Sequence, residues 1–225
     1  MAYRSEFFVL NDGKPIPVVI RNYTKADFDE LICIQSECFP PPFPEKLWWN
    51  KKQLLNHVTL FPEGAICIEV DGMLAGSMTG LCIQFDPQHP AHTWEEITDG
   101  GYIRNHDKHG NTLYIVDISI RPSYRKLGLG KLMMQVMYQM VVHLGLERLL
   151  GGGRISGYHE KANKMTVKQY VSAVMAGKVK DPVITFLLNC GRTPVELIEN
   201  YLDDEESHHY GLLMEWKNPF KEKVE

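Results

Sequence analysis

The residues with the clearest chemical potential lie in one turn, Arg125-Lys126-Leu127-Gly128-Leu129-Gly130. An apolar segment precedes this turn and a long amphipathic pattern follows it. The first N–H groups of a helix have no acceptor inside the helix, and together with the helix dipole they form a site for an anion such as a pyrophosphate. Glycine at 128 and 130 lets a ligand approach the main chain. Positive charge beside the turn comes from Arg125, Lys126 and Lys131.

Two established phosphate-binding motifs do not fit this turn. A P-loop requires Ser or Thr after the glycine and lysine, whereas Leu132 follows Lys131 here. A dinucleotide-binding fingerprint requires Gly or Ala at position 133, which is Met. Turns that join a strand to a helix also use glycine for close packing alone, and a nucleotide phosphate site of another kind stays open.

Asp117 is the second candidate, because it interrupts the apolar segment 113–120. A buried carboxylate is costly unless it has partners, so its pKa can rise into the range of a general base. The alternative is a structural role, in which Asp117 accepts main-chain hydrogen bonds or pairs with an arginine. Strand alternation points Asp117 away from the side taken by Ile118 and Ile120, unless a bulge intervenes.

Histidine and cysteine do not form a metal-binding pattern. Four of the nine histidines fall in the segment 86–110 and two more are adjacent at 208 and 209, without HExxH or zinc-finger spacing. The five cysteines are odd in number and contain no CxxC pair, which is typical of reduced core thiols in a cytosolic protein. We therefore predict no metal site.

Composition excludes several classes of protein. The 225 residues are 44% hydrophobic and 23% charged, as in globular proteins, and the net charge is −4. A general nucleic-acid binder needs a basic surface, so we expect no nucleic-acid partner. No segment of about 18 apolar residues occurs, and the first residues lack the pattern of a signal peptide. We expect a cytoplasmic protein that does not associate with membranes.

The first half of the chain predicts an arm at 1–17, a strand at 18–21 and a helix that begins after Thr24 and ends before Pro40. Pro44 suits the first residue of a second helix. Asp71-Gly72 predicts a hairpin turn between strands 65–70 and 73–85. The polar segment 86–110 reads as a long loop with a short helix after Thr93, and it could serve as a lid.

The second half alternates strands and helices. The segment 113–120 predicts a central strand, and unbroken apolar spacing predicts an amphipathic helix over 128–144. A strand is expected over 148–153, with the glycines 151–153 as its last residues. Two helices follow, after Thr166 and from Pro182, and then two strands at 194–199 and 210–216. This layout belongs to the α/β (α+β) class with one core.

The segment Arg125-x-x-Gly128-x-Gly130, preceded by a strand that ends in Ile120-Arg121-Pro122, resembles the signature [RQ]-x-x-G-x-[GA] of the GCN5-related N-acetyltransferase (GNAT) family. The order of elements also resembles that family over residues 18–217. The resemblance implies a single domain over 18–217, an N-terminal arm at 1–17 and a tail at 218–225. It implies a mixed, mostly antiparallel sheet that splays at its middle strands and is flanked by helices.

Segments outside the signature are similar to a GNAT subgroup that also occurs fused to carbon–nitrogen (nitrilase-type) hydrolases. They are Gly152-Gly153-Arg154-Ile155-Ser156-Gly157-Tyr158-His159, Asp181-Pro182, Asn200-Tyr201 and Glu215-Trp216-Lys217-Asn218-Pro219.

The resemblance also implies acetyl-CoA as co-substrate, without a metal. Main-chain groups of Ile118 and Ile120 would hold the pantetheine and the acetyl group like an added strand. The amides of Leu127, Gly128, Leu129, Gly130 and Lys131 would hold the pyrophosphate, beside Arg125 and Lys126. An amine would then attack the thioester directly, with a base, an oxyanion donor and an acid for the thiolate.

At two positions the chain departs from the family pattern. Leu187 stands where many members have the tyrosine that acts as the acid, and Arg192 replaces a phenylalanine after Gly191. Leu187 cannot donate a proton. The candidates for acid and base are therefore Asp117, Tyr201, Tyr210, Cys190 and Tyr114, of which we select Asp117 and Tyr201.

Two functions follow from these observations. The first is an N-acetyltransferase that moves acetyl to a primary amine of a small molecule or peptide. The second is a catalytically weak acyl-CoA-binding regulatory module that works with a separate partner enzyme, which the absent tyrosine favours. Trp48, Trp49 and Phe61 could line an acceptor cleft or belong to the core. A homodimer is compatible with the sequence, which leaves the oligomeric state and the acceptor open.

Overall fold

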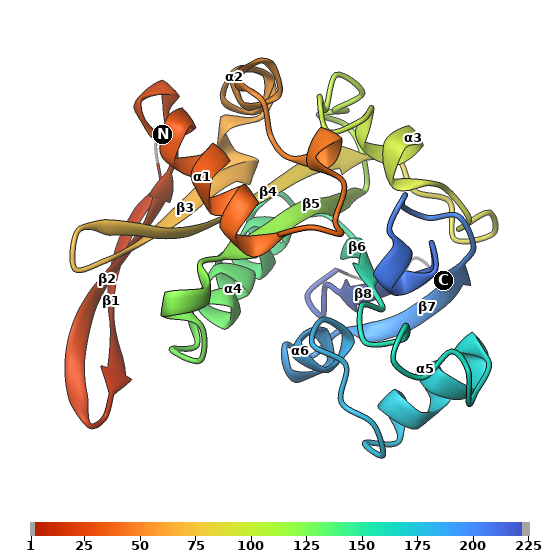
Figure 1. The fold of residues 1–225 in the computed structure, drawn as a ribbon. Coiled ribbons are helices and arrows are strands. Elements are labelled where there is room, and N and C mark those ends of the chain that lie inside the picture. The colour runs from red at the N-terminus through yellow and green to blue at the C-terminus, as the bar shows by residue number, and fades with distance from the viewer. Residues whose placement is uncertain (1–2, 222–225) are drawn as a thin grey trace.

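An eight-stranded sheet organises the computed structural model, which describes residues 3–221 (Figure 1). The strands are β1 (Arg4–Asn11), β2 (Lys14–Asn22), β3 (Ala65–Val70), β4 (Met73–Ile83), β5 (Thr112–Ile120), β6 (Arg148–Arg154), β7 (Thr193–Ile198) and β8 (Gly211–Lys217). Their spatial order is β1-β2-β3-β4-β5-β6-β8-β7, and every neighbouring pair is antiparallel except β5–β6. The predicted mixed, mostly antiparallel sheet is confirmed.

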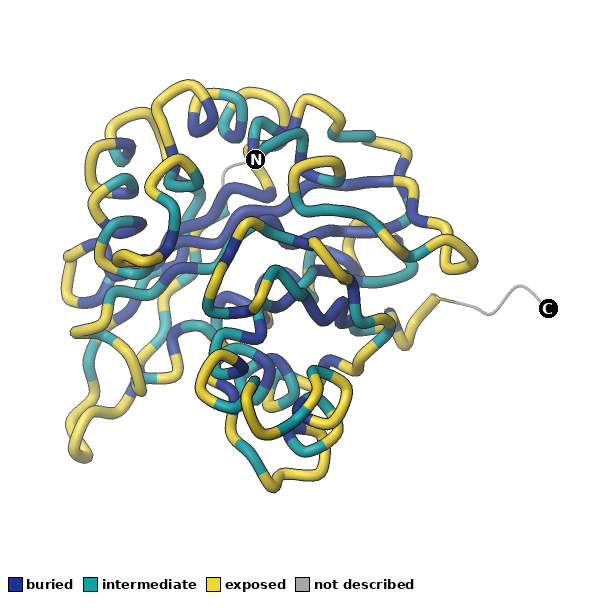
Figure 2. Tube along the Cα trace, turned by 45° about the vertical axis from the view of Figure 1, so that its right-hand side comes forward, coloured by how far each residue is buried: buried dark blue, intermediate teal, exposed yellow. Residues whose placement is uncertain are grey.

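Helices cover both faces of this sheet, as the ribbon in Figure 1 shows. The helices are α1 (Phe28–Cys38), α2 (Lys51–Leu60), α3 (Trp94–Thr98), α4 (Leu129–His143), α5 (Val167–Met175) and α6 (Ile184–Asn189). On one face α1 packs against β4 and β5, whereas α4 packs against β5 and β6 on the other. Apolar side chains of the strands and of the inner helix faces form one core. Figure 2 shows that the central strands consist largely of buried residues.

The sheet splays between β5 and β6. These strands pair only where Thr112–Tyr114 lie beside Arg148–Leu150. Beyond that point β5 stays paired to β4 as far as Ile120, and β6 stays paired to β8 as far as Arg154. Each strand is therefore held from its outer side while the edges that face one another remain apart, as the resemblance implied.

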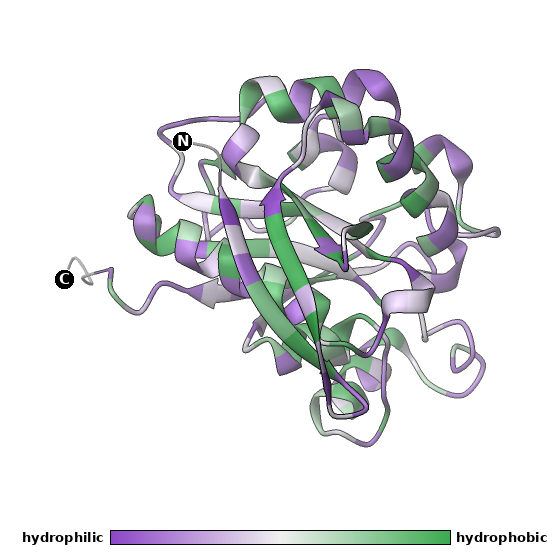
Figure 3. Ribbon diagram, turned by 90° about the vertical axis from the view of Figure 1, so that its left-hand side faces the viewer, coloured by the Kyte–Doolittle hydropathy of each residue, from purple (hydrophilic) through white to green (hydrophobic). Residues whose placement is uncertain are grey.

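The N-terminal residues differ from the expected arm. Residues 4–22 form the β1–β2 hairpin, closed by Asp12 and Gly13 at φ angles of 50° and 78°. Proline is tolerated here because pairing of β2 with β3 begins only at Val18, so Pro15 and Pro17 lie beyond the end of β3. The hairpin faces the viewer in Figure 3, and its strands carry both apolar and polar residues.

The second helix also begins later than expected. Pro44 precedes only a single 3-10 turn, and α2 begins at Lys51. Asn50 caps it, because its side chain accepts hydrogen bonds from the N–H groups of Lys52 and Gln53, and Gln53 completes a capping box. The local cap therefore determines the helix start more strongly than the proline six residues earlier does.

The glycines 151–153 lie inside β6, which extends one residue beyond the predicted strand to Arg154. A Cβ added at Gly152 would lie 2.2 Å from Cζ of Tyr201, and one added at Gly153 would lie 2.8 Å from a methyl carbon of Leu187. Side chains from other segments thus occupy the space beside this strand, and the absence of side chains on β6 makes room for them.

The hairpin turn at Asp71-Gly72 and the helix starts after Thr24, Thr93 and Thr166 lie where the sequence predicts them, and each of these threonines forms a capping box. The tail begins in contact with the domain, because the main-chain N–H of Asn218 donates to the carbonyl of Glu147. Residues 222–225 lie outside the described residues. Of the helices within residues 3–221, none has the length and apolar character that a membrane crossing needs.

Buried Asp181 predicts a test of this fold. Its carboxylate accepts hydrogen bonds from the N–H groups of Gly157, Val183 and Ile184 and from the hydroxyl of Tyr170, which connects β6 to α5 and α6. Asp181→Ala leaves these donors without an acceptor, so we expect a loss of about 3 kcal/mol in the free energy of unfolding, measured by urea titration. Asp86→Ala, at an exposed position, is the control; an equal loss there would contradict this assignment.

Candidate active site

The turn before α4 presents a row of unoccupied main-chain donors. Gly128 is the N-cap residue, at a φ of 78° that glycine adopts without strain, and Lys126 has a φ of 72°. Within residues 3–221, no protein acceptor lies in hydrogen-bond range of the N–H groups of residues 126–130. The side chains of Arg125, Lys126 and Lys131 are exposed around them. Electrostatically and geometrically the turn suits a phosphate group.

Main-chain groups of Ile118 and Ile120 face the gap. The N–H of Arg121 donates to Ala75 of β4, and the carbonyl of Ser119 also points toward β4. Because main-chain directions alternate along a strand, the groups of the intervening residues point to the opposite edge. The Ile120 carbonyl accepts a hydrogen bond from Nε of Arg125, at 3.2 Å. The gap edge of β5 therefore leads directly to the turn.

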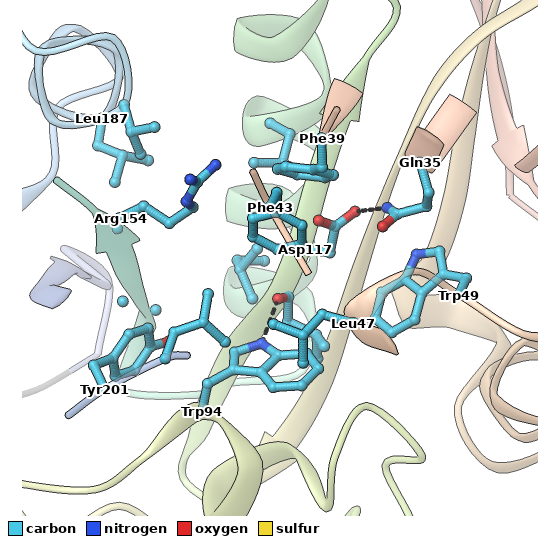
Figure 4. A pocket seen from close by; sticks show the side chains of 18 of the residues that line it. Gln35, Phe39, Phe43, Leu47, Trp49, Trp94, Asp117, Arg154, Leu187 and Tyr201 are labelled. Carbon is cyan, nitrogen blue, oxygen red and sulfur yellow. Dashed lines mark hydrogen bonds between the residues drawn. The ribbon is translucent and has the colours of Figure 1, made fainter. Parts of the chain in front are cut away.

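An apolar cavity of about 130 Å³ lies where β5 and β6 separate (Figure 4). Its floor and walls come from the segments 115–118 and 151–154, from α1 and the residues after it, from α3 and from α6. Aromatic and aliphatic side chains that line it are Phe39, Phe43, Leu47, Trp49, Trp94 and Leu187. Asp117, Gln35, Arg154 and Tyr201 supply the polar groups that Figure 4 labels.

Asp117 lines this cavity and directly follows a bulge in β5. Thr79 pairs with Asp117 but the next residue, Gly80, pairs with Ile115, so Val116 is the additional residue. The indole Nε1 of Trp94 donates to the Val116 carbonyl at 3.0 Å. Beyond the bulge the strand alternates as expected, because Asp117 and Ser119 both contact Gln35 of α1 whereas Ile118 lies beside Gly130 of α4. Asp117 and Ile118 both line the cavity because it opens between β5 and β6.

The Asp117 carboxylate accepts hydrogen bonds from the side-chain amide of Gln35 at 2.9 Å and from the hydroxyl of Ser119 at 2.8 Å. Its partners are thus neutral, and neither is an arginine. Burial raises the pKa of Asp117 to about 6, although these two hydrogen bonds act in the opposite direction. A carboxylate with a pKa near neutrality can accept a proton from an ammonium group.

Tyr201 lies across the cavity from the α1 side and is only 2% exposed. Its hydroxyl contacts that of Tyr114 at 2.8 Å, and its carbonyl accepts a hydrogen bond from the N–H of Trp94 at 2.7 Å. Burial raises the pKa of Tyr201 to about 12, although the buried Arg192 lowers it. Tyr201 therefore keeps its proton at neutral pH.

Arg192 is the residue that the sequence pattern left without a role. It is 3% exposed, and its Nη2 donates to the carbonyls of Gly151, at 3.0 Å, and of Met214. No carboxylate lies within ion-pair distance of it among the described residues, and its Nε has no partner. Burial lowers the pKa of Arg192 to about 10. At neutral pH the guanidinium therefore keeps its positive charge, in the wall of the cavity.

Arg154 carries the other guanidinium that lines the cavity; it is half-buried, and protein carboxylates balance its charge. It forms ion pairs with Asp204 and Glu206, each at 2.7 Å, and its guanidinium lies 4.7 Å from the ring centre of Phe43. Its charge is therefore balanced by protein carboxylates, unlike that of Arg192.

The remaining candidates lie elsewhere. The hydroxyl of Tyr210 donates a hydrogen bond to the carboxylate of Glu199, and Cys190 is the C-cap residue of α6. The ring of Phe61 stacks on His106. Of the three aromatic residues considered for the acceptor cleft, only Trp49 lines the cavity. Phe39, Phe43 and Trp94 were missed; the prolines after Phe39 and the cap before Trp94 marked only a helix end and a helix start.

The histidines of the segment 86–110 have separate partners. His89 contacts Asp86, His106 accepts a hydrogen bond from the N–H of Cys82, and His92 contacts Tyr114. Within the described part of the chain, no three His, Cys, Asp or Glu side chains are grouped as metal ligands would be.

The raised pKa predicts how Asp117 affects stability. The folded-state pKa, about 6, exceeds the unfolded value of about 3.9, so the contribution to stability is complete below the unfolded value and is lost as pH rises through about 6. We expect the melting temperature of the parent minus that of Asp117→Asn to fall between pH 4 and pH 7 in thermal unfolding. For Asp27, whose pKa is lowered because its hydrogen bonds with Arg21 and Thr24 outweigh burial, the corresponding difference should stay constant over this range and decrease only as pH falls below about 4. A flat difference for Asp117 would refute the raised pKa.

Comparison with known proteins gives consistent results. A sequence profile of the Acetyltransferase (GNAT) family matches residues 28–156. The Uncharacterized N-acetyltransferase YkwB of Bacillus subtilis (strain 168) is 54% identical over 216 residues, which are 96% of each chain. The Probable hydrolase YhcX of the same strain is 39% identical over 202 residues, but the match spans only 39% of that protein.

Solved structures show the same fold. The GphF GNAT-like decarboxylase in complex with isobutyryl-CoA superposes with a TM-score of 0.73 at 23% identity, over 88% of this chain and 98% of that one. The loading GNATL domain of CurA from Lyngbya majuscula gives 0.75 at 18% identity, over 89% and 98%. The family profile and the 54%-identical relative show that this chain belongs to the acetyltransferase (GNAT) family and is an acyltransferase.

Proposed function

We propose that this protein transfers acetyl from acetyl-CoA to a primary amine of a small molecule or peptide by direct attack of the amine. The observation that supports this most is the continuity of the site. Free amides at the turn, the open edge of β5 and the cavity with Asp117 and Tyr201 follow one another along the same gap. A thioester extended along that gap would bring its carbonyl to the cavity.

The binding half of the proposal uses charge and main-chain donors. The pyrophosphate would contact the amides of Leu127, Gly128, Leu129 and Gly130, with the side chains of Arg125, Lys126 and Lys131 beside it. The expected amide contact from Lys131 is corrected, because the N–H of Lys131 donates to the Gly128 carbonyl at 3.0 Å. Pantetheine would pair with Ile118 and Ile120 in place of the missing β6 partner. A Salmonella typhimurium putative acetyltransferase of this fold, at 12% identity and a TM-score of 0.55, was solved with acetyl-CoA.

Asp117 and Tyr201, which line the cavity from opposite sides, would each carry out one proton transfer. Asp117 takes a proton from the substrate ammonium, and the free amine attacks the thioester carbon. The C–N bond forms, the C–S bond breaks, and Tyr201 donates a proton to the departing sulfur of CoA. Arg192, which has no balancing carboxylate, stabilises the negative charge that develops on the thioester between them.

The acceptor would enter from a second, more polar cavity of about 590 Å³. Leu47, Trp94, Tyr201 and Leu202 line both cavities, so the two are adjacent. Asn50, Gln53, Glu95 and Asp203 supply polar groups to the outer one. This arrangement favours an amine attached to an apolar or aromatic group, whose polar remainder lies in the outer cavity.

The second candidate, a catalytically weak acyl-CoA-binding module that works with a separate enzyme, rests on one observation. Leu187 lines the cavity at the position of the usual acid and cannot donate a proton. The related protein YhcX is more than twice as long as the matched segment and is named a probable hydrolase. Binding of acetyl-CoA without turnover of any amine would favour this candidate.

Gly128→Glu tests the phosphate site. The substitution adds a negative charge where the free amides converge, and it strains a residue at positive φ. The parent should gain about 2.7 kcal/mol of stability at an acetyl-CoA concentration of 100 times its Kd, and the variant should gain none, in a thermal-shift assay. Gly177→Glu, also at positive φ and remote from the turn, controls for strain. An equal acetyl-CoA shift in parent and Gly128→Glu would contradict the assigned site.

Asp117→Asn and Tyr201→Phe test the two proton steps. With an amine that the parent acetylates, each variant should lower kcat by about 10²-fold or more, because a positioned acid or base contributes roughly 10² to 10⁴. Acetyl-CoA binding should persist in both, and release of free CoA measures the rate. Asp86→Asn is the control at an exposed carboxylate. Undiminished turnover in Asp117→Asn would remove that residue from the mechanism.

A further inference from the structure

A chain of three hydrogen-bonded side chains leads from the cavity to the surface. The hydroxyl of Tyr201 contacts that of Tyr114 at 2.8 Å, and the hydroxyl of Tyr114 contacts Nε2 of His92 at 3.0 Å. Tyr201 lines both cavities, Tyr114 is completely buried, and His92 is half-buried on the segment 86–110. His92 is thus the member of the chain that solvent reaches.

The direction of this chain follows from its outer end. Nδ1 of His92 lies 2.7 Å from the carbonyl of Pro90, which can only accept, so Nδ1 carries a hydrogen. In neutral His92, Nε2 must then accept from Tyr114, and Tyr114 accepts from Tyr201. The proton of Tyr201 is therefore directed away from the cavity. When His92 is protonated, Nε2 donates instead, both tyrosines reverse, and the Tyr201 hydroxyl can donate into the cavity.

We propose that His92, acting through Tyr114, supplies the proton that Tyr201 gives to the thiolate of CoA. This inference rests on the proposed acetyltransferase function. The steps balance: one proton passes from Tyr201 to sulfur, one from Tyr114 to Tyr201 and one from His92 to Tyr114. The His92 imidazole is left neutral and recovers its proton from solvent. No phenolate accumulates, and the chain performs the step for which Leu187 has no proton.

The charged groups around the chain are few. Burial lowers the pKa of His92, whereas the Pro90 carbonyl and the Glu96 carboxylate act in the opposite direction. Burial raises the pKa of both tyrosines, and Arg192 opposes that rise for each of them. Glu96 belongs to α3, and His92 lies in the segment that precedes α3. Arg192 immediately precedes β7. The charged groups near the relay therefore come from three parts of the chain.

If His92 served only as a hydrogen-bond partner for Tyr114, its ability to take up a proton would not matter. Buried hydroxyls need hydrogen-bond partners, and any acceptor at position 92 would satisfy Tyr114. Glutamine offers such an acceptor but does not titrate. His92→Gln therefore separates partnership from proton supply, and His89→Gln is a matched control in the same segment, where the side chain is 83% exposed.

The experiment measures kcat against pH for the parent, His92→Gln, Tyr114→Phe and His89→Gln, with one acetylated amine, alongside the acetyl-CoA thermal shift of each. We expect the parent kcat to rise as Asp117 loses its proton and to fall as pH rises through the pKa of His92, because the base must be ionised and the relay protonated. In His92→Gln and Tyr114→Phe, kcat should be at least about 10-fold lower than in the parent and should no longer fall with the titration of His92. The thermal shift that acetyl-CoA causes should be the same as in the parent. His89→Gln should match the parent.

Two results would overturn the relay, and they are distinguishable. If the parent turns over and His92→Gln keeps its kcat and pH profile, the relay fails while the proposed function stands. If the parent binds acetyl-CoA but acetylates no amine, the proposed function fails and the relay with it. If His92→Gln folds poorly, Tyr114→Phe replaces it as the test, because this variant keeps the buried ring. A parent-like kcat and pH profile in Tyr114→Phe would then refute the relay, and their loss would support it.

Discussion

The site depends on where two parallel strands stop pairing. β5 and β6 share only the register from Thr112 to Tyr114, although each continues beyond it. A strand edge without a partner is costly when it is buried, because its N–H and carbonyl groups then lack hydrogen bonds. Here the outer edges stay paired to β4 and β8, so the fold tolerates the open inner edges and leaves them available to a ligand.

Several polar side chains beside the gap also lack the partners that buried polar or charged groups usually have. Asp117 has only neutral partners, Arg192 has no carboxylate, and Tyr201 is bonded to another phenol. The first two arrangements are unfavourable for stability taken alone, since buried charges are usually paired. Their position beside one cavity, where burial shifts the pKa values of Asp117 and Arg192, is a pattern typical of catalytic sites.

The sequence predicts those features that local physics decides. The turn before α4, the hairpin at Asp71-Gly72 and the caps of α3 and α5 each depend on a few adjacent residues. The cavity walls do not, because Phe39, Phe43 and Trp94 come from segments without periodic patterns and meet only in the folded chain. The bulge before Asp117 also needs the register of β4 to be known.

The bare strand β6 has one further consequence. Its three glycines contribute no side chains to the gap, so Leu187, Tyr201 and Arg192 approach its main chain from α6, from the β7–β8 connection and from the start of β7. The shape of this wall can therefore change through residues that lie outside the sheet, while the pairing of β6 with β8 is untouched. The side chains that bound the gap can therefore be exchanged without altering the strand pairing that supports it.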